Sequence, residues 1–221
     1  MLKALIFDFD GLILDTETPE VDIWTRIYAE HGYDFPFHDW AQTVGGYGVS
    51  NFDAAEHLAL LSQGQLDPVS LRARHHAESS AVIERSSILP GVLDMIHAAK
   101  QHGLKLAIAS SSRHAWVDGH AKRLGIFHLF DHVICADDVG VGRTKPNPDL
   151  FLLALNRLQV QNNEAVVFED SPNGVLAARR AGIFVVAVLN PLTARLGVEG
   201  ANLVVKSFSD LSFPELLAKV E

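Results

Sequence analysis

An apolar run near the start of the chain ends in two acids and a glycine, Leu5-Ile6-Phe7-Asp8-Phe9-Asp10-Gly11. A short apolar run bounded by a turn residue is typical of a strand buried on both faces, because a helix needs a longer periodic stretch. The two acids would point the same way from the carboxyl end of that strand, where open α/β sheets bind their ligands. The pair predicts a catalytic or metal-binding site, with two turn-capping acids as the plainer alternative.

Beyond residue 88 the chain alternates short apolar runs with helical segments. Parallel neighbours in a sheet need crossover connections, so this alternation predicts an α/β fold, a doubly wound parallel sheet with helices on both faces. We expect this core to comprise residues 1–14 and 88–221. The strands expected after the first are 104–109, 132–136, 165–168, 184–189 and, at an edge, 202–205.

Residues 15–87 contain no stretch that resembles a buried strand. Thr18 is expected to cap a first helix, with Pro19 at its first position, and residues 54–61 and 68–84 carry further helix formers. The glycine-rich segment 45–48 follows no strand, so a turn is favoured over a phosphate-binding loop. The segment is predicted to be a small, all-helical insert.

Composition excludes several classes of protein. The chain has 221 residues, a net charge of −9 and a single cysteine. Scattered basic residues argue against a nucleic-acid surface, and one cysteine excludes an internal disulfide or a multi-cysteine zinc site. There is no apolar run long enough for a membrane helix and no signal-peptide pattern. We therefore expect a cytoplasmic monomer that acts on a small molecule.

Polar residues follow the expected strands at the edge where a parallel sheet gathers its carboxyl ends. They are Asp8 with Asp10, Ser110 with Ser111, Asp137 with Asp138, and Glu169 with Asp170, and Lys145 lies on a loop at the same edge.

Each of these groups has a role in phosphate chemistry. Carboxylates at the ends of the first and fourth strands would bind Mg²⁺, which prefers one or two carboxylates together with substrate phosphate. Ser110, the adjoining backbone N–H groups and Lys145 would hold phosphate oxygens. Asp8 would attack phosphorus and Asp10 would protonate the leaving oxygen.

Each group also has a plainer reading by itself. Ser110 could cap the next helix, and Lys145 could be a solvated loop cation. Glu169 and Asp170 could interact with a helix N-terminus, which is worth about 0.3–1 kcal/mol. Asp137 and Asp138 are best explained as acids at a helix N-terminus, although Asp138 could also hold a site residue in position. The joint arrangement around one sheet edge favours an active site over independent caps.

These motifs resemble those of the haloacid dehalogenase superfamily. Asp8-Phe9-Asp10-Gly11 looks like its first motif, with a nucleophilic and then an acid–base aspartate. Ser110 looks like the second motif, Lys145 the third, and Glu169-Asp170 the fourth. The resemblance implies a Rossmann-like core and a Mg²⁺ site formed by Asp8, the backbone carbonyl of Asp10, Glu169 and Asp170. It implies a phosphatase with an aspartyl-phosphate intermediate.

The helical insert resembles the small cap of the phosphoglycolate phosphatase and β-phosphoglucomutase-like subgroup. Glu20, Trp24 and Tyr47 are its candidate specificity residues, although Trp24 could equally pack inside the cap. The mutase has a histidine where this chain has Glu20 and an arginine where it has the Gly48-Val49 region, which favours a phosphatase acting on a sugar phosphate or similar ester. A mutase-like phosphotransferase and a non-catalytic phosphate-binding regulatory module are the alternatives.

Overall fold

The computed structural model describes residues 1–44 and 50–220, and at its centre is a six-stranded sheet. All five strand pairs are parallel, and the strand order is β3-β2-β1-β4-β5-β6. The strands are β1 (Ala4–Phe7), β2 (Lys105–Ala109), β3 (His132–Ile134), β4 (Ala165–Glu169), β5 (Phe184–Val188) and β6 (Leu203–Val205). The predicted doubly wound α/β architecture is confirmed.

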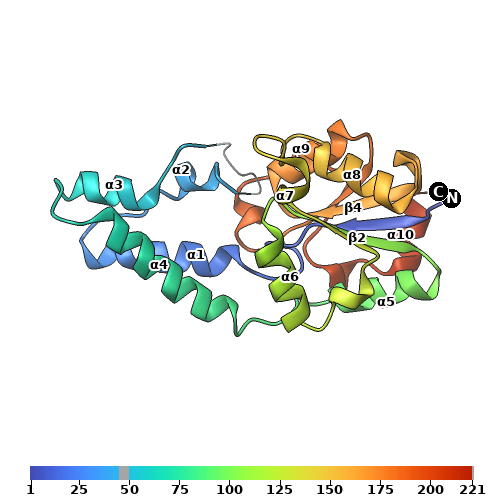
Figure 1. Ribbon diagram of the computed structural model, residues 1–221, viewed down its shortest axis with the longest axis horizontal. Coiled ribbons are helices and arrows are strands. Elements are labelled where there is room, and N and C mark those ends of the chain that lie inside the picture. The colour runs from blue at the N-terminus through green and yellow to red at the C-terminus, as the bar shows by residue number, and fades with distance from the viewer. Residues whose placement is uncertain (45–49, 221) are drawn as a thin grey trace.

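Alternate side chains of the central strands belong to two separate cores, as the period of two in a strand requires. Leu5 and Phe7 contribute to one core, and Ala4 and Ile6 to the other. The first core is covered by α5 (Val92–Gln101), α6 (His114–Arg123) and α10 (Phe213–Val220), and the second by α8 (Asp149–Leu158) and α9 (Pro172–Arg180). Figure 1 shows these helices above and below the sheet.

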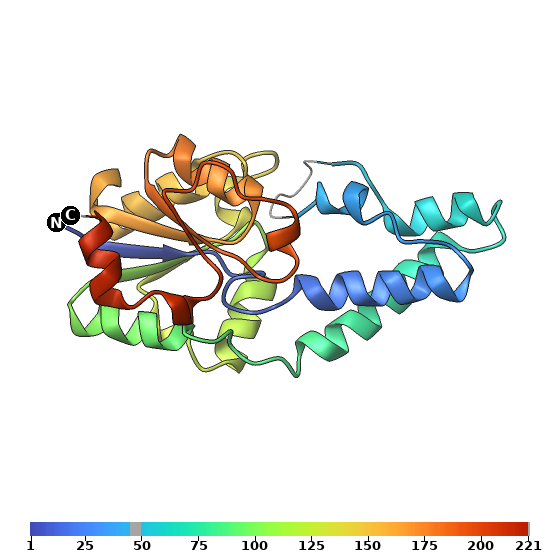
Figure 2. The same ribbon diagram turned by 180° about the vertical axis from the view of Figure 1, so that it is seen from behind.

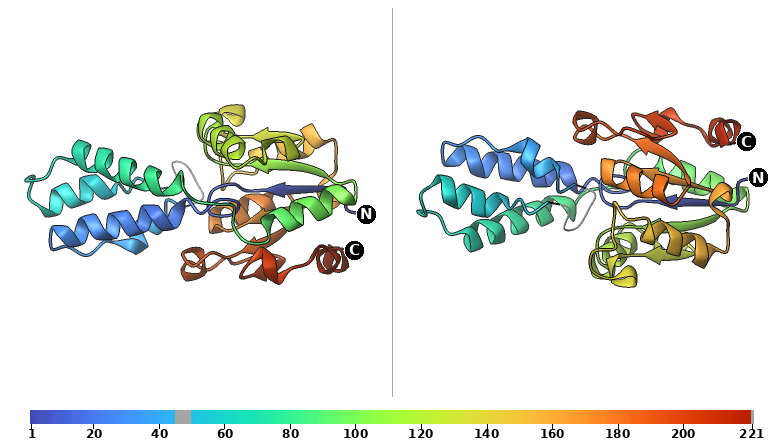
Figure 3. Two further views of the ribbon diagram at one scale, coloured as in Figure 1. Left: turned by 90° about the horizontal axis from the view of Figure 1, so that it is seen from below. Right: turned by 90° about the horizontal axis from the view of Figure 1, so that it is seen from above.

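Four helices lie together beyond the carboxyl edge of the sheet, at the end opposite both termini (Figures 2 and 3). They are α1 (Glu17–Glu30), α2 (Phe37–Ala41), α3 (Ala54–Leu61) and α4 (Pro68–Ile83). The Trp24 ring stacks on His75 at 4.2 Å, and the Tyr28 hydroxyl donates to the Ala54 carbonyl at 2.7 Å. These helices form the predicted cap, while its limits at 15 and 87 stay a prediction. No helix in the described residues has the length and apolar character needed to span a bilayer.

Three expected boundaries are wrong. The first cap helix begins at Glu17 after Thr16, not at Pro19, because the Asp15 carboxylate accepts the N–H of Thr18 at 3.0 Å and supports an earlier start. The sequence Leu89-Pro90-Gly91 predicts a helix that starts at Pro90, but α5 begins at Val92 after Gly91, whose φ of 81° is left-handed. Strand β3 stops at Ile134, and the two acids expected after it lie in the short helix α7 (Ala136–Val139).

The imidazole of His114 joins α6 to α7. Its Nδ1 is 3.1 Å from Asp118 and its Nε2 is 2.8 Å from Asp138, which also accepts the N–H of Cys135. The backbone N–H of His114 donates to Asp137 at 2.8 Å. Burial lowers the pKa of His114, but the two carboxylates outweigh burial and raise it above its usual value. Asp137 and Asp138 therefore have the structural role that their sequence favoured, and Cys135 beside them is buried.

We predict that His114→Asn destabilises the protein more at low pH than at high pH. Because the pKa of His114 is raised in the folded state, its ion pairs with Asp118 and Asp138 stabilise the protein fully below the ordinary pKa of 6.5. This stabilisation is lost as pH rises through the raised value. Because the side chain is about one-third exposed, the loss should be about 0.5–1 kcal/mol at pH 5.5 and smaller at pH 9. Denaturant unfolding at both pH values measures it.

His120→Asn is the matched control for this experiment. Burial lowers the pKa of His120, so its contribution to stability should show the opposite pH trend. Equal losses of unfolding free energy at pH 5.5 and pH 9 for His114→Asn would contradict the role of the protonated His114.

Candidate active site

The strand order reverses between β1 and β4, and this is where the predicted acids meet. In doubly wound sheets the crevice at such a reversal is the usual ligand site, because neighbouring crossovers leave the sheet on opposite faces. The N–H of Asp8 donates to the Phe168 carbonyl at 3.0 Å, so the chain remains paired one residue beyond β1. Asp8 and Asp170 therefore leave adjacent strands side by side.

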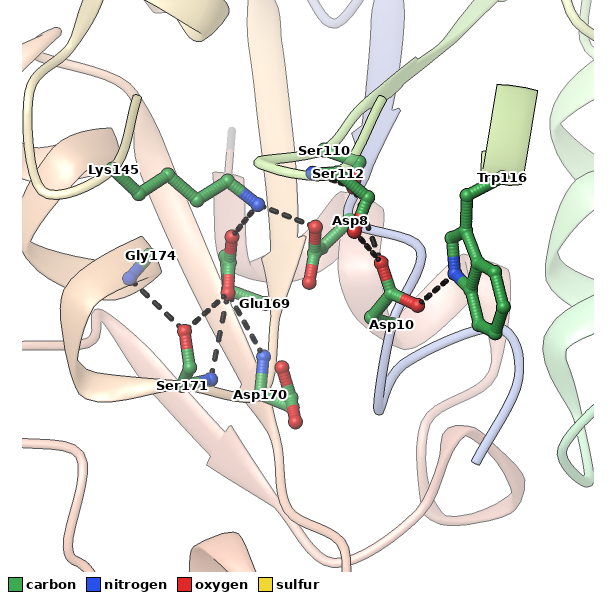
Figure 4. Close-up of polar contacts among 10 residues, drawn as sticks. All are labelled: Asp8, Asp10, Ser110, Ser112, Trp116, Lys145, Glu169, Asp170, Ser171 and Gly174. Atoms are coloured by element: carbon green, nitrogen blue, oxygen red, sulfur yellow. Dashed lines mark hydrogen bonds and ion pairs between the residues drawn. The ribbon is translucent and has the colours of Figure 1, made fainter. Parts of the chain in front are cut away.

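Lys145 is the cation of this site, and it reaches the acids from the loop before α8. Only 1% of the residue is exposed, and its Nζ forms ion pairs with Asp8 and, at 2.5 Å, with Glu169 Oε1 (Figure 4). Burial lowers the pKa of Lys145, but its two carboxylate partners outweigh burial and raise it. Lys145 is thus a buried ammonium beside the predicted nucleophile and not a solvated loop cation.

Glu169 links this lysine to the N-terminus of α9. Its Oε2 accepts from the backbone N–H of Asp170 at 3.2 Å and from the Ser171 hydroxyl at 3.2 Å, while Oε1 faces Lys145. The Ser171 hydroxyl in turn accepts the N–H of Gly174 at 3.1 Å, which makes Ser171 the N-cap of α9. Glu169 is therefore a helix-terminus acid, as its plainer reading held, and it also contacts the lysine of the predicted site.

Asp170 is oriented by a residue that the sequence analysis missed. Asn190 donates through its amide to Asp170 Oδ2 at 2.9 Å and to the Gly11 carbonyl at 3.1 Å. Gly11 has a φ of 76°, and a Cβ at this position would overlap the Asp170 carboxyl group, so the close approach requires glycine. Asn190 follows β5, and searching that strand end for polar residues, as for the other strands, would have found it.

The carboxylates of Asp8, Glu169 and Asp170 form a set that fits a divalent cation. Each offers one oxygen, and these oxygens lie within 4.8 Å of one another. Asp170 Oδ1 is buried without a hydrogen-bond partner among the described residues. Burial, reinforced by neighbouring acids, raises the pKa of Asp8 and of Asp170, which is the repulsion that a bound cation would relieve. An all-oxygen donor set suits Mg²⁺.

The carboxylate of Asp10 faces a different group of residues. Its Oδ2 accepts hydrogen bonds from Ser112 Oγ at 2.7 Å and Ser110 Oγ at 3.3 Å, and its Oδ1 accepts from Trp116 Nε1 at 2.7 Å (Figure 4). Ser110 does not cap α6, whose N-cap is Arg113. Ser110 instead accepts the N–H of Ser112 at 3.0 Å, which organises the loop after β2.

Ser111 lies in this loop between the two serines that contact Asp10, and it is half-buried. Ser112 and Trp116 were missed by the sequence analysis. The serine run pointed to this loop, but nothing in the sequence indicated an indole contact from the following helix.

Two acids in the first turn of α1 face the site from the cap. Burial, reinforced by Asp10, raises the pKa of Glu20 to about 7 and also raises that of Glu17, whose Oε2 is buried without a hydrogen-bond partner among the described residues. Glu17 was not predicted. Trp24 is 6% exposed and packs inside the cap, as its plainer reading held, and Tyr47 lies outside the described residues.

We predict that Gly174→Ala inactivates and destabilises the protein. A Cβ there would overlap the Glu169 carboxyl group, so Glu169 would have to leave both Lys145 and the α9 N-terminus. We expect a loss of about 2–3 kcal/mol in unfolding free energy and a fall of about 100-fold in kcat/KM. Urea unfolding and a phosphate-release assay measure the two effects.

Gly119→Ala is the control, because a Cβ at that helical glycine would meet no atom within 4 Å. It should stabilise α6 by about 0.5–1 kcal/mol. Unchanged stability in Gly174→Ala would contradict the tight packing described above.

Comparisons with known proteins agree with this geometry. The haloacid dehalogenase-like hydrolase family matches residues 2–182. YhcW of Bacillus subtilis (strain 168) is 40% identical over 217 residues, 98% of this chain and 97% of that protein. Fructose-1-phosphate phosphatase YqaB of Escherichia coli (strain K12) is 36% identical over 84% of this chain and 95% of that protein.

A solved structure resembles this chain over nearly its whole length. CbbY from Rhodobacter sphaeroides, in complex with xylulose-(1,5)bisphosphate, superposes with a TM-score of 0.72 at 25% identity, and the match covers 98% of this chain and 99% of that one. The predicted family is confirmed: the chain belongs to the haloacid dehalogenase-like hydrolases.

Proposed function

We propose that this protein is a Mg²⁺-dependent phosphatase that hydrolyses a small phosphomonoester through a phosphoryl group carried on Asp8. The observation that carries the proposal is the buried contact of Lys145 with both Asp8 and Glu169 at the switch point of the sheet. A carboxylate can attack an anionic phosphate only where cations offset the repulsion, and Lys145 is held beside that carboxylate.

The first half-reaction transfers the phosphoryl group to the protein. A carboxylate oxygen of Asp8 bonds to phosphorus while the bond from phosphorus to the leaving oxygen breaks. Lys145 and the hydroxyl of Ser110 would hold the other phosphate oxygens, with backbone N–H groups from the loop at Ser111. Asp10, protonated at that stage, gives its proton to the leaving oxygen and becomes a carboxylate.

The second half-reaction releases phosphate and restores the starting state. A water molecule attacks phosphorus, Asp10 takes its proton, and the bond between phosphorus and Asp8 breaks. Asp8 is again a free carboxylate, Asp10 is again protonated, and inorganic phosphate leaves. The same two acids thus complete both steps with balanced protons.

The residues that would hold Mg²⁺ are Asp8 and Asp170 with the backbone carbonyl of Asp10, and Glu169 close by. When bound, the ion would neutralise negative charge on the phosphate and on the attacking carboxylate. Asn190 and Gly11 support this site by keeping Asp170 in place, which leaves its buried Oδ1 free to coordinate.

The substrate that best suits the cap is a phosphorylated polyol or sugar. Glu17 and Glu20 turn acidic groups toward the site, and carboxyl groups bind hydroxyls well as donors or acceptors. The relatives support this class, since YqaB is named for fructose-1-phosphate and CbbY was solved with a sugar bisphosphate. The expectations of a cytoplasmic monomer without nucleic-acid or membrane partners belong to this proposal.

Replacing Asp8 with Asn should abolish turnover, since the amide cannot form the phosphoryl intermediate. Phosphate release from p-nitrophenyl phosphate and from a panel of sugar phosphates measures the loss, with the exposed Asp94→Asn as an isosteric control. Unchanged turnover in Asp8→Asn would overturn the mechanism. Isomer interconversion by the native protein without net phosphate release would instead identify a mutase, and phosphate binding without turnover a regulatory module.

Mg²⁺ should raise the melting temperature of the native protein, because a ligand that binds only the folded state stabilises it by mass action. Asp170→Asn should abolish this rise and the activity, whereas Asp94→Asn should retain both. Differential scanning fluorimetry with and without EDTA measures the shift. An equal Mg²⁺-dependent shift in Asp170→Asn would exclude Asp170 from the metal site.

A further inference from the structure

The two oxygens of Asp10 have chemically different neighbours. Oδ1 accepts the indole N–H of Trp116 at 2.7 Å, and Oδ2 faces the hydroxyls of Ser112 and Ser110 at 2.7 and 3.3 Å. The indole and the serines approach the carboxyl group from opposite sides (Figure 4).

These neighbours differ in whether they can accept a hydrogen bond from Asp10. An indole nitrogen only donates hydrogen bonds, whereas a serine hydroxyl can turn to donate or accept. A proton on Oδ1 would point at the Trp116 N–H and break that hydrogen bond. A proton on Oδ2 keeps the bond to Trp116 and finds a hydroxyl able to accept it.

The position of Trp116 is fixed by its surroundings. It lies in the first turn of α6, whose N-terminus is held to α7 through His114. Its ring packs edge-on against His120 at 4.2 Å. The indole N–H is therefore directed at Asp10 before any substrate arrives, and this is what positioning a proton donor requires.

We propose that Trp116 is a positioning residue that confines the proton of Asp10 to Oδ2, the oxygen on the side of the phosphate-binding serines. This inference rests on the proposed function, in which Asp10 protonates the leaving oxygen. In that step the bond from Oδ2 to its proton breaks as the leaving oxygen takes the proton, and the resulting carboxylate keeps the Trp116 hydrogen bond on Oδ1.

The test is Trp116→Phe, which keeps an aromatic ring and removes the N–H. A general acid matters most when the leaving group is a poor one, so kcat/KM for an alkyl phosphate such as fructose 1-phosphate or glycerol phosphate should fall about 10-fold. For p-nitrophenyl phosphate, whose leaving group departs without a proton, kcat/KM should change less than about 2-fold. The inhibition constant of inorganic phosphate should not change, because the serines and Lys145 remain.

Trp40→Phe is the matched control, since it makes the same change in α2 of the cap, where the indole packs on Phe35 and Phe37. It should leave the ratio of alkyl to aryl kcat/KM at the native value. Equal losses on both kinds of ester in Trp116→Phe, or the same selective loss in Trp40→Phe, would overturn the role of the N–H. Circular dichroism shows whether each variant is folded.

The two proposals fail in different ways. If the native protein hydrolyses none of the esters, the proposed function is wrong. If the native protein is active and Asp8→Asn is not, but Trp116→Phe keeps the native alkyl-to-aryl ratio, the proposed function stands and the role of Trp116 is wrong.

Discussion

The balance of charge around Lys145 is the constraint on which the rest of the site depends. Acids from adjacent strands are buried within reach of one another, and burying unpaired charge costs several kcal/mol per ion. Lys145 pairs with Asp8 and Glu169, yet Asp170 retains a buried oxygen with no partner among the described residues. Protein groups alone leave excess negative charge here, and that excess is what suits the site to a metal ion and a phosphate.

The surrounding structure fixes the positions of these carboxylates. Glu169 accepts hydrogen bonds from the Ser171 hydroxyl and the Asp170 N–H at the start of α9, and Gly174 leaves room for its carboxyl group. Asn190 ties Asp170 to the turn at Gly11. Glycines at the two closest approaches show that the backbone is shaped around the carboxylates. Rigid placement of this kind is the main source of electrostatic stabilisation in phosphoryl transfer.

Two aspartates that share one motif acquire different environments. Asp8 continues the pairing of β1 and is buried against Lys145, while Asp10 lies in the turn and meets the serine loop and Trp116. The cap adds Glu17 and Glu20, so the side of the site that faces the cap is acidic. The proposed nucleophile, the proposed proton donor and the two cap acids thus have separate positions within residues 8–20.

The sequence by itself predicted the layered fold, the helical cap and the residues that meet at one edge of the sheet, because apolar runs and the polar residues that end them are local patterns. It placed Asp8, Lys145 and Asp170 at one edge through the general rule for parallel sheets. It mistook the start of α1, where the Asp15 side chain competes with the expected cap.

Only the tertiary structure decided how the carboxylates divide their contacts. Asp10 meets Trp116 across 106 residues of chain, and Asn190 meets Asp170 across 20. The position of Asn190 after β5 marks it as a candidate, but no local signal names the partner of either residue, since each contact depends on how a helix or strand packs against its neighbour. The physical reason is that a change of a fraction of an ångström in the distance between two groups decides whether they form a hydrogen bond. Packing sets that distance, and sequence spacing does not.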